Sequence, residues 1–309
     1  MKFVRYARPG GEVQVAVVVP EGFRVLQGYT DLLPLIESGE AALLAAGREA
    51  ETSGDEVDPA AVQILSPLET PPTFRDFYAF EQHVRAGRAW RGLEMDPTWY
   101  EIPVFYFSNP YAFRADGEIP MTPGAAKFDF ELEVAAVVGK AGANLTVEEA
   151  ADHIIGYCVL NDWSGRDVQH REMTLSMGPV KGKDTATGLG PYLVTRNELA
   201  PFATRSGFDR AMTLTVNGRR YAEANWADVH WSFPQMISYA SRGTQVRPGD
   251  VIGSGTCGTG CILELSRTHS EEAYPWLKEG DEVVATVEGL GSLRNTIVAA
   301  DPVHPLDRS

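Results

Sequence analysis

Short apolar runs, separated by glycine and proline, follow one another along most of the chain from Pro67 onward. Runs of this length suit strands better than helices. The runs are PVFYF 103–107, ELEVAAVVG 131–139, IIGYCVLND 154–162, PYLVT 191–195, MTLTV 212–216, DVIGSG 250–255 and DEVVATVEG 281–289. Helices are fewer: a capping-box pattern at Thr146 and Glu149 predicts one over 146–154, and a second is expected over 231–243. We therefore predict an α+β fold that is rich in strands.

The first 66 residues have a different texture and predict a small N-terminal α/β domain, with the remaining domain covering 67–309. A strand is expected over 13–19 and helices over 31–39 and 40–50. The polar stretch at 51–61 is typical of a linker. An Asn-Gly pair at 217–218 predicts a hairpin turn in the large domain.

Composition excludes several classes of protein. The chain has 27 Lys and Arg against 42 Asp and Glu, a formal charge of −15, which argues against nucleic acid as a partner. Hydrophobic residues make up 44%, enough for a packed core, yet no run approaches the ~20 apolar residues of a membrane helix. Three cysteines cannot all pair with one another, and a reducing compartment suits them. We expect a cytoplasmic protein that does not enter the membrane.

Two glutamates in FDFELEV, Glu131 and Glu133, are two positions apart, so one strand would place both on the same face. Their repulsion could be removed by a divalent cation, and two further carboxylates, Asp76 and Asp162, stand near the ends of predicted elements. Oxygen ligands suit Mg²⁺, with Mn²⁺ or Ca²⁺ as alternatives. The competing interpretation is a solvated face of an antiparallel sheet.

Three further segments offer polar groups. His83 follows Asp76 by seven residues, which is two helical turns if the segment is helical, and would place a base beside the ion. An ordinary surface histidine is the alternative. The glycine-rich run at 247–261, with Thr256 inside it and Glu264 after it, would let backbone amides approach a ligand, or would simply form a tight turn. Lys183 lies between glycines in MGPVKGKD.

Taken together and in this order, these segments resemble the fumarylacetoacetate hydrolase family. The resemblance depends on RDFYAFEQHV, FDFELEVAAVVG, VLNDWSGRDVQ, GPVKGKD, RPGDVIGSGT and LELS, and runs from about residue 67 to about residue 295. It implies a catalytic domain that is a mixed β-roll or sandwich, preceded by a small variable domain. It also implies a homodimer.

The resemblance assigns roles to individual residues. It implies that Asp76, Glu131, Glu133 and Asp162 hold a divalent metal, usually Mg²⁺. It implies that His83 and Glu264 activate water and that Lys183 meets developing negative charge. Substrate contacts would come from Tyr78, Tyr106, Arg166, Gln169 and Thr256. The family's arginine after the histidine has two offset candidates here, Arg88 and Arg91.

The function expected from the resemblance is metal-dependent hydrolysis of the C–C bond of a β-diketo acid, a small dicarbonyl molecule such as fumarylacetoacetate or an acylpyruvate. This reaction belongs to aromatic catabolism. The same scaffold serves isomerases, decarboxylases and dehydratases that act on 2-oxo acids through a metal-stabilised enolate. A non-catalytic metal-stabilised protein would not require the matched Tyr, Lys, Arg and Gln residues.

Residues 81–100 carry the proposed base together with Gly87, Gly92, Trp90 and Trp99. Two interpretations stay open. The segment is either a lid that orders over bound ligand or a helix-loop connection that its tryptophans pack onto the core.

Overall fold

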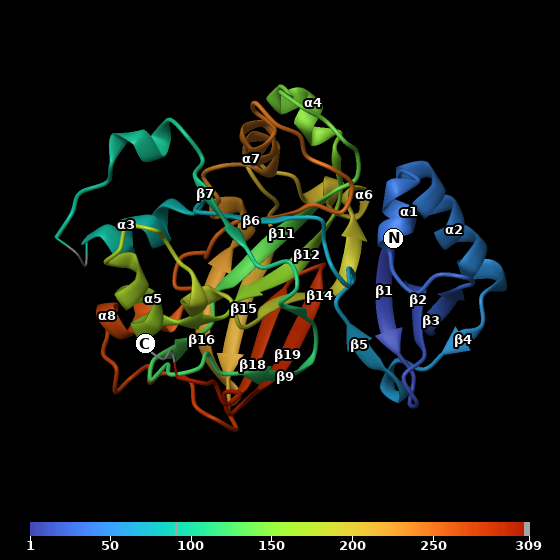
Figure 1. The fold of residues 1–309 in the computed structure, drawn as a ribbon. Helices are drawn as coiled ribbons and strands as arrows, with labels where there is room; N and C mark the ends of the chain where they lie inside the picture. Colours follow the sequence, from blue (N-terminus) through green and yellow to red (C-terminus); the bar gives the residue numbers. More distant parts are fainter. Residues whose placement is uncertain (90–91, 306–309) are drawn as a thin grey trace.

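Two β-sheets stacked on one core make up the body of the protein (Figure 1). The computed structural model describes residues 1–89 and 92–305. The larger sheet is 12-stranded. Its strands, in spatial order, are β4 (Glu56–Val57), β3 (Gly22–Leu26), β2 (Val13–Val19), β1 (Lys2–Ala7), β14 (Thr187–Thr195), β12 (Ile154–Asp162), β11 (Leu132–Val138), β17 (Val251–Gly253), β6 (Phe74–Phe77) and β7 (Phe105–Ser108), with β5 (Gln63–Leu65) on β1 and β8 (Phe113–Arg114) on β14.

The second sheet is 5-stranded and packs against the first across a shared hydrophobic core. Its strands, in order, are β16 (Arg219–Asn225), β15 (Ala211–Val216), β18 (Glu282–Val287), β19 (Gly291–Val298) and β9 (Gly117–Pro120). The β15–β16 hairpin turns at Asn217 and Gly218, whose φ angles of 50° and 76° suit the Asn-Gly turn predicted there. A two-stranded ladder joins β10 (Phe128–Asp129) to β13 (Ser164–Gly165).

Strand β11 shows how the sequence produces the layers. Leu132, Val134 and Ala136 pack into the core shared with the second sheet, whereas Ala135 and Val137 belong to the core on the opposite face. A strand covered on both faces needs apolar residues at nearly every position, and in LEVAAVV the one exception is Glu133, whose carboxylate belongs to the carboxylate site. The predicted strand-rich α+β fold is confirmed.

Most helices are short, and the longest, α2 (Glu40–Ser53), packs with α1 (Leu33–Glu37) on one face of β2 and β3 (Figure 1). The helices predicted at 146–154 and 231–243 are present, and Thr146 and Glu149 form the predicted capping box. The other α-helices are α3 (Glu81–Ala89), α4 (Val147–Ala151), α5 (Arg166–Met173), α6 (Arg196–Leu199), α7 (Phe233–Ala240) and α8 (Ile262–Thr268). The 3₁₀ turns are η1 (Pro59–Ala61), η2 (Pro97–Tyr100), η3 (Lys181–Lys183), η4 (Ala200–Phe202) and η5 (Trp226–Asp228).

The N-terminal segment continues the large sheet. Strand β1 pairs with β14, with Phe3 opposite Leu193, so the sheet crosses the predicted boundary after residue 66. The expected linker at 51–61 is wrong: this stretch contains the end of α2, strand β4 and η1. Its polar residues are mostly exposed, and Asp58 accepts a hydrogen bond from the Ala60 amide. Polar composition here marks a surface, and the division into two domains stays a prediction.

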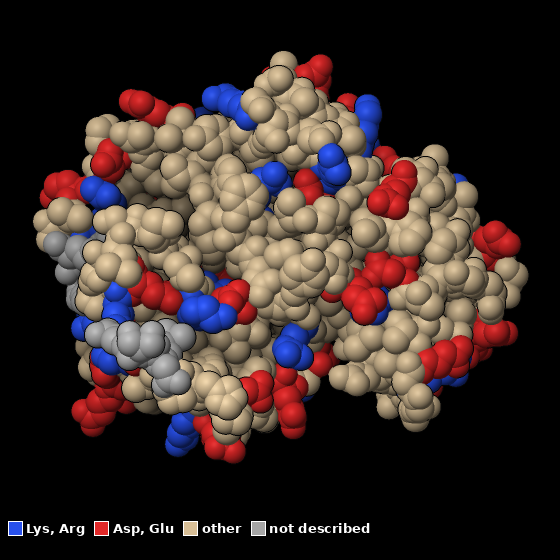
Figure 2. All heavy atoms as spheres, viewed as in Figure 1, with Lys and Arg blue, Asp and Glu red and all other residues tan. Residues whose placement is uncertain are grey.

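Surface charge is mixed on the face shown in Figure 2, where basic side chains are scattered among acidic ones. Among the described residues, no helix has both the length and the apolar character needed to cross a membrane.

Candidate active site

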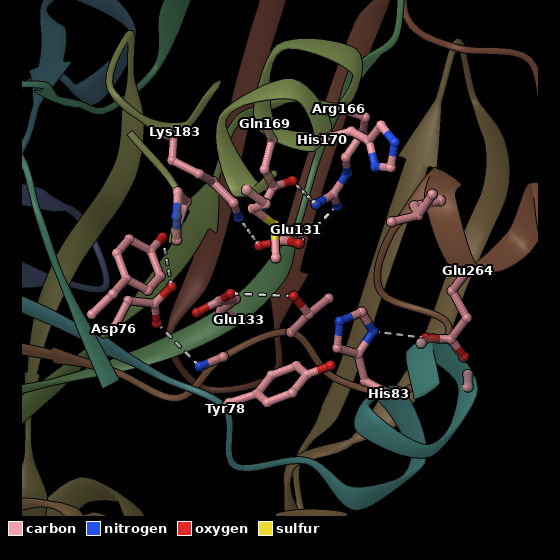
Figure 3. Close-up of a pocket in the computed structure, with 18 of the residues that line it drawn as sticks. Asp76, Tyr78, His83, Glu131, Glu133, Arg166, Gln169, His170, Lys183 and Glu264 are labelled. Atoms are coloured by element: carbon pink, nitrogen blue, oxygen red, sulfur yellow. Dashed lines mark hydrogen bonds and ion pairs between the residues drawn. The ribbon is translucent and has the colours of Figure 1, made fainter. Parts of the chain in front are cut away.

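A cavity of about 850 Å³ opens at the end of the large sheet where β6, β7 and β11 meet helices α3, α5 and α8 (Figure 3). Of the twelve residues predicted to bind metal, act in catalysis or contact substrate, eleven line it: Asp76, Tyr78, His83, Tyr106, Glu131, Glu133, Arg166, Gln169, Lys183, Thr256 and Glu264. The exception, Asp162, ends β12 and contacts the cavity residues Tyr106 and Lys183. The fold therefore gathers residues that are up to 188 positions apart, from Asp76 to Glu264.

Three buried carboxylates lie close together in the site. Asp76, Glu133 and Asp162 each offer an oxygen, and these oxygens lie within 4.8 Å of one another. Strand pairing explains the position of Asp76, because β6 places it opposite Gly253 of β17. A Cβ at Gly253 would lie 2.3 Å from Asp76 Oδ1, so a side chain has no room there. Two residues further on, the backbone amide of Gly255 donates a hydrogen bond to the same oxygen at 3.2 Å. The close approach of Asp76 therefore requires glycine at position 253.

The charges of this trio are poorly compensated. Burial, together with the nearby Asp162, raises the pKa of Asp76 to about 8. Burial also raises the pKa of Glu133 and of Asp162, and Asp76 adds to the effect on Glu133. Glu133 Oε2 and Asp162 Oδ1 are buried without a hydrogen-bond partner among the described residues. A hard divalent cation would satisfy these oxygens and remove the repulsion, so the residues fit such an ion.

Glu131 has a different environment from the trio. It precedes β11 rather than lying within it, because β11 begins at Leu132. One oxygen accepts from Arg166 Nη2 at 2.7 Å and the other is ion-paired with Lys183. Burial acts to raise the pKa of Glu131, but Lys183 and Arg166 outweigh it and lower that pKa. Glu131 and Glu133 are 5% and 0% exposed, so neither lies on a solvated face of the sheet.

Lys183 and Tyr106 surround Asp162 with donors. Lys183, at the end of η3, donates to Asp162 Oδ2 at 2.5 Å, and Tyr106 of β7 donates to the same oxygen at 2.5 Å. Burial favours the neutral amine of Lys183, yet Asp162 and Glu131 raise its pKa above the ordinary value. Burial and Asp162 raise the pKa of Tyr106. At neutral pH Lys183 is therefore a cation and Tyr106 a neutral donor.

On the opposite wall of the cavity, His83 and Glu264 form a pair. His83 Nδ1 lies 2.9 Å from Glu264 Oε2, and Glu264 Oε1 accepts from the Thr259 amide at 2.9 Å (Figure 3). The helical spacing proposed to join His83 to Asp76 is wrong, because Asp76 is on strand β6 and helix α3 begins at Glu81. A turn between the two elements, and not the helical repeat, brings both residues to one cavity.

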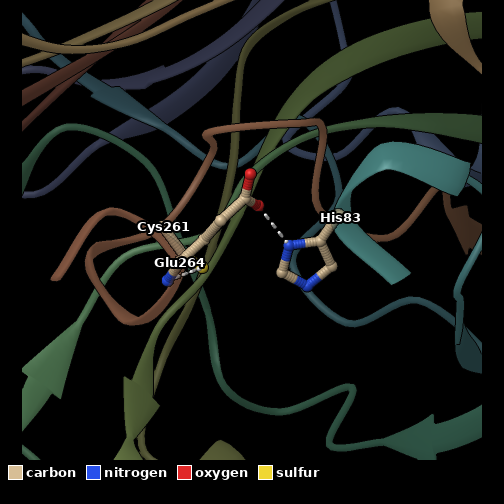
Figure 4. A group of neighbouring side chains, drawn as sticks. All are labelled: His83, Cys261 and Glu264. Carbon is tan, nitrogen blue, oxygen red and sulfur yellow. Dashed lines mark hydrogen bonds and ion pairs between the residues drawn. The ribbon is translucent and has the colours of Figure 1, made fainter. Parts of the chain in front are cut away.

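Cys261 lies beside this pair (Figure 4). A ligand atom from each of His83, Cys261 and Glu264 lies within 4.8 Å of the others, a grouping that the sequence spacing of the cysteines did not predict. The thiol is fully buried, does not line the cavity, and accepts from the Glu264 amide at 3.4 Å. Burial raises the pKa of Cys261 well above its ordinary value. We infer that Cys261 caps the first turn of α8.

The residues assigned to substrate also meet one another. Arg166 Nη1 donates to Gln169 at 3.2 Å, and Thr256 Oγ1 lies 3.4 Å from Glu133 Oε1. The Tyr78 and His83 rings make an edge-on contact with centroids 5.8 Å apart. Arg166 thus lines the cavity, and it also donates hydrogen bonds to Asp129 and Glu131.

Several residues of the site were not found from the sequence. Helix α5, RDVQHREM, has no apolar periodicity to predict it, although it carries Arg166 and Gln169. His170, Lys127 and Arg267 also line the cavity, and no role was assigned to them from the sequence. Asp129 could have been suspected, because it is a charge inside the apolar run FDFELEV.

The segment at 81–100 is only partly described. Trp90 and Arg91 lie outside the described residues. Trp99 is 6% exposed, donates through Nε1 to the Tyr78 carbonyl, and is not among the cavity-lining residues. Arg88 donates to the Glu94 carbonyl and does not line the cavity either. Trp99 therefore packs as the helix-loop interpretation expects, and a lid stays a prediction for the remainder of the segment.

Comparison with known proteins gives the family. Residues 73–298 match the family model described as fumarylacetoacetate (FAA) hydrolase C-terminal, which is well over half of the chain. The chain belongs to the fumarylacetoacetate hydrolase family. It is 27% identical to the fumarylacetoacetase of rice, Oryza sativa, over 72% of this chain, and spans 65% of that protein's length.

Solved structures share the fold. The fumarylacetoacetate hydrolase of the psychrophile Exiguobacterium antarcticum matches 97% of this chain and 99% of its own at a TM-score of 0.75 and 22% identity. The 5-carboxymethyl-2-hydroxymuconate delta-isomerase of Mycobacterium smegmatis matches 97% of this chain and 100% of its own at a TM-score of 0.69 and 21% identity. Hydrolases and isomerases thus share this architecture, and the chain belongs to a family of enzymes.

Proposed function

We propose that the protein is a metal-dependent hydrolase that cleaves the C–C bond of a β-diketo acid, such as fumarylacetoacetate or an acylpyruvate. The observation that carries the proposal is the His83–Glu264 pair, 2.9 Å apart, on the same cavity as Asp76 and Glu133 of the carboxylate trio. Isomerisation and decarboxylation need a stabilised enolate but no attacking water. A histidine oriented by a carboxylate is the arrangement that activates water.

A divalent cation held by Asp76, Glu133 and Asp162, which we propose to be Mg²⁺ with Mn²⁺ or Ca²⁺ as alternatives, would polarise the carbonyl oxygens of a chelating dicarbonyl. Glu131 keeps an unused lone pair on each oxygen while it accepts from Arg166 and Lys183, so it could join this set as a fourth ligand.

His83 acts as the base. With Nδ1 hydrogen-bonded to Glu264, Nε2 is the ring atom that accepts a proton from water. The resulting hydroxide adds to the carbonyl carbon of the acyl group. The bond between that carbon and the neighbouring α-carbon then breaks, its electron pair stays on the α-carbon as an enolate, and the imidazolium returns the proton to that carbon. One water is consumed and two acids are formed.

Lys183 stabilises charge as it develops. Two of its N–H groups donate to Glu131 and Asp162, which leaves a third to donate to the oxyanion formed on water attack. Thr256 and Gln169, on the walls of the same cavity, orient the substrate.

The proposal is tested by a spectrophotometric screen of the purified protein with Mg²⁺. Acylpyruvates, fumarylacetoacetate, oxaloacetate and 2-hydroxymuconates are the substrates, and His83→Ala is the control. Loss of the diketone enol absorbance with formation of two acids supports hydrolysis. Turnover only of 2-hydroxymuconates or of oxaloacetate would assign the site to isomerisation or decarboxylation.

A further inference from the structure

Asp129, the last residue of β10, is fully buried and has no role in the reaction described above. Its carboxylate accepts three hydrogen bonds. Arg166 Nε donates to Oδ2 at 2.7 Å, the Ile262 amide to Oδ1 at 2.7 Å, and the Leu263 amide to Oδ2 at 3.0 Å. One carboxylate therefore joins β10, the start of α5 and the first turn of α8.

The bond to Arg166 leads to the carboxylate wall of the cavity. The same guanidinium donates through Nη2 to Glu131 at 2.7 Å, and Glu131 in turn pairs with Lys183 (Figure 3). A planar guanidinium held at Nε by one carboxylate presents its remaining donors in a fixed direction. Asp129 thereby fixes the direction from which Arg166 holds Glu131.

The hydrogen bonds from the two backbone amides connect Asp129 to the opposite wall of the cavity. Leu263 immediately precedes Glu264, so the amides of Ile262 and Leu263 belong to the backbone that carries the carboxylate of the His83–Glu264 pair. A movement of this turn would lengthen the 2.9 Å contact between Glu264 Oε2 and His83 Nδ1. Displacements of about 1 Å in a catalytic group are enough to cost about 100-fold in rate.

We propose that Asp129 is a positioning residue that sets the spacing between the two walls of the active site, holding Arg166 and Glu131 on one side and Glu264 with His83 on the other. The effect on rate rests on the proposed hydrolase function, whereas the effect on the His83–Glu264 contact does not.

The geometry makes a specific demand on residue 129, because three donors converge on two acceptor oxygens. Asparagine has the same shape but only one acceptor. Its amide nitrogen would face either the Ile262 amide or both the Leu263 amide and Arg166 Nε, and in each case donors face donors. Asp129→Asn thus removes the connection without removing bulk.

Asp250 offers a matched control. It is also buried, at 2% exposed, and its carboxylate accepts from Thr73 Oγ1 at 2.8 Å and from the Arg247 amide at 2.9 Å. It does not line the cavity. Asp250 also accepts from Arg75 Nη1 at 3.5 Å, so Asp250→Asn disturbs a buried aspartate of comparable bonding whose donors include neither Arg166 nor the amides that precede Glu264.

The test uses the full chain loaded with Mg²⁺ and labelled with ¹⁵N-histidine. The protein has six histidines, and His83→Gln assigns the signal of the His83 Nδ1 proton. We expect Asp129→Asn to move or abolish this signal and Asp250→Asn to leave it in place. With a substrate from the screen, kcat should fall about 10- to 100-fold in Asp129→Asn, the range seen when outer positioning groups are lost, with KM changed less than about 3-fold.

A folded Asp129→Asn protein that keeps both the His83 signal and the kcat of Asp250→Asn would overturn the proposal. If Asp129→Asn does not fold, Arg166→Lys carries the test, because it keeps the positive charge in the cavity but removes the planar guanidinium that joins Asp129 to Glu131. An unchanged signal in Arg166→Lys then overturns the proposal, and a moved signal supports it. If the wild type hydrolyses no dicarbonyl, the function fails while the signal still decides the role of Asp129.

Discussion

The imidazole of His83 and the carboxylate of Glu264 are 181 positions apart in the sequence, yet Nδ1 and Oε2 lie 2.9 Å from each other across the ends of α3 and α8. Neither residue belongs to the carboxylate trio. The site therefore separates a base from a cation-binding group, and the two can be tested independently.

Replacing His83 with Ala should lower kcat by about 10² to 10⁴, the usual contribution of a general base. Mg²⁺ affinity, measured by isothermal titration calorimetry, should stay within a few-fold of wild type because His83 is not a proposed ligand. Glu264→Gln should behave in the same way, and the double variant should be no worse than the single ones. The exposed His269, which does not line the cavity, supplies the control His269→Ala. Near wild-type turnover by His83→Ala would place the base elsewhere.

Glu133→Gln should have opposite effects on metal binding and on the stability of the metal-free protein. Glu133 is fully buried beside Asp76 and Asp162, where burial and Asp76 raise its pKa, so keeping an ionisable carboxyl there costs stability and a neutral amide relieves that cost. The metal-free variant should melt higher than metal-free wild type, by about 2 °C for each kcal/mol of relief. Addition of Mg²⁺ should raise the melting temperature of wild type only. A Mg²⁺-dependent increase in Glu133→Gln equal to that of wild type would remove Glu133 from the cation site.

The stability of the metal-free protein should decrease as pH rises from about 4 to about 8. Asp76 has its pKa raised to about 8 in the folded chain from an ordinary value of 3.8, so between these values the folded state holds a proton that the unfolded state has lost. Unfolding free energy then falls with increasing pH. The increase in melting temperature caused by Mg²⁺ should grow over the same range, because the cation must displace this proton. In Asp76→Asn both trends should be weaker, and identical trends in that variant would assign them to another group.

Lys183→Met should be strongly destabilising. The ammonium is buried between Glu131 and Asp162, and removing it leaves two carboxylates without their cation. Loss of one member of a buried ion pair costs about 3 to 5 kcal/mol. Chemical denaturation measures this, with the exposed Lys181→Met as a control that should change little. A loss below about 1 kcal/mol in Lys183→Met would mean that the pair is not maintained in solution.

Patterns of apolar residues predicted several strands, among them β11 and β12, which are buried along their whole length, whereas β1, β3 and β19 were not predicted. The Asn-Gly turn and the capping box at Thr146 are local signals and were equally clear. Helix α5 and the short strand β4 were not predicted from the sequence, because both are polar and their positions depend on tertiary contacts. The candidate site residues came from a resemblance of motifs. The helical spacing gave a wrong relation between His83 and Asp76, because Asp76 lies on strand β6 and His83 on helix α3.

The homodimer and the cytoplasmic location stay predictions, as does the identity of the cation. The central claim is that water attacks a carbonyl of the substrate and that the C–C bond then breaks. Incubation of the Mg²⁺-loaded protein with an acylpyruvate in H₂¹⁸O, followed by mass spectrometry of the products, tests this directly. Hydrolysis predicts two acids, with one ¹⁸O atom placed in the carboxylate of the acid derived from the acyl group. A product that keeps the carbon skeleton intact, with no ¹⁸O introduced by the enzyme, would contradict the account.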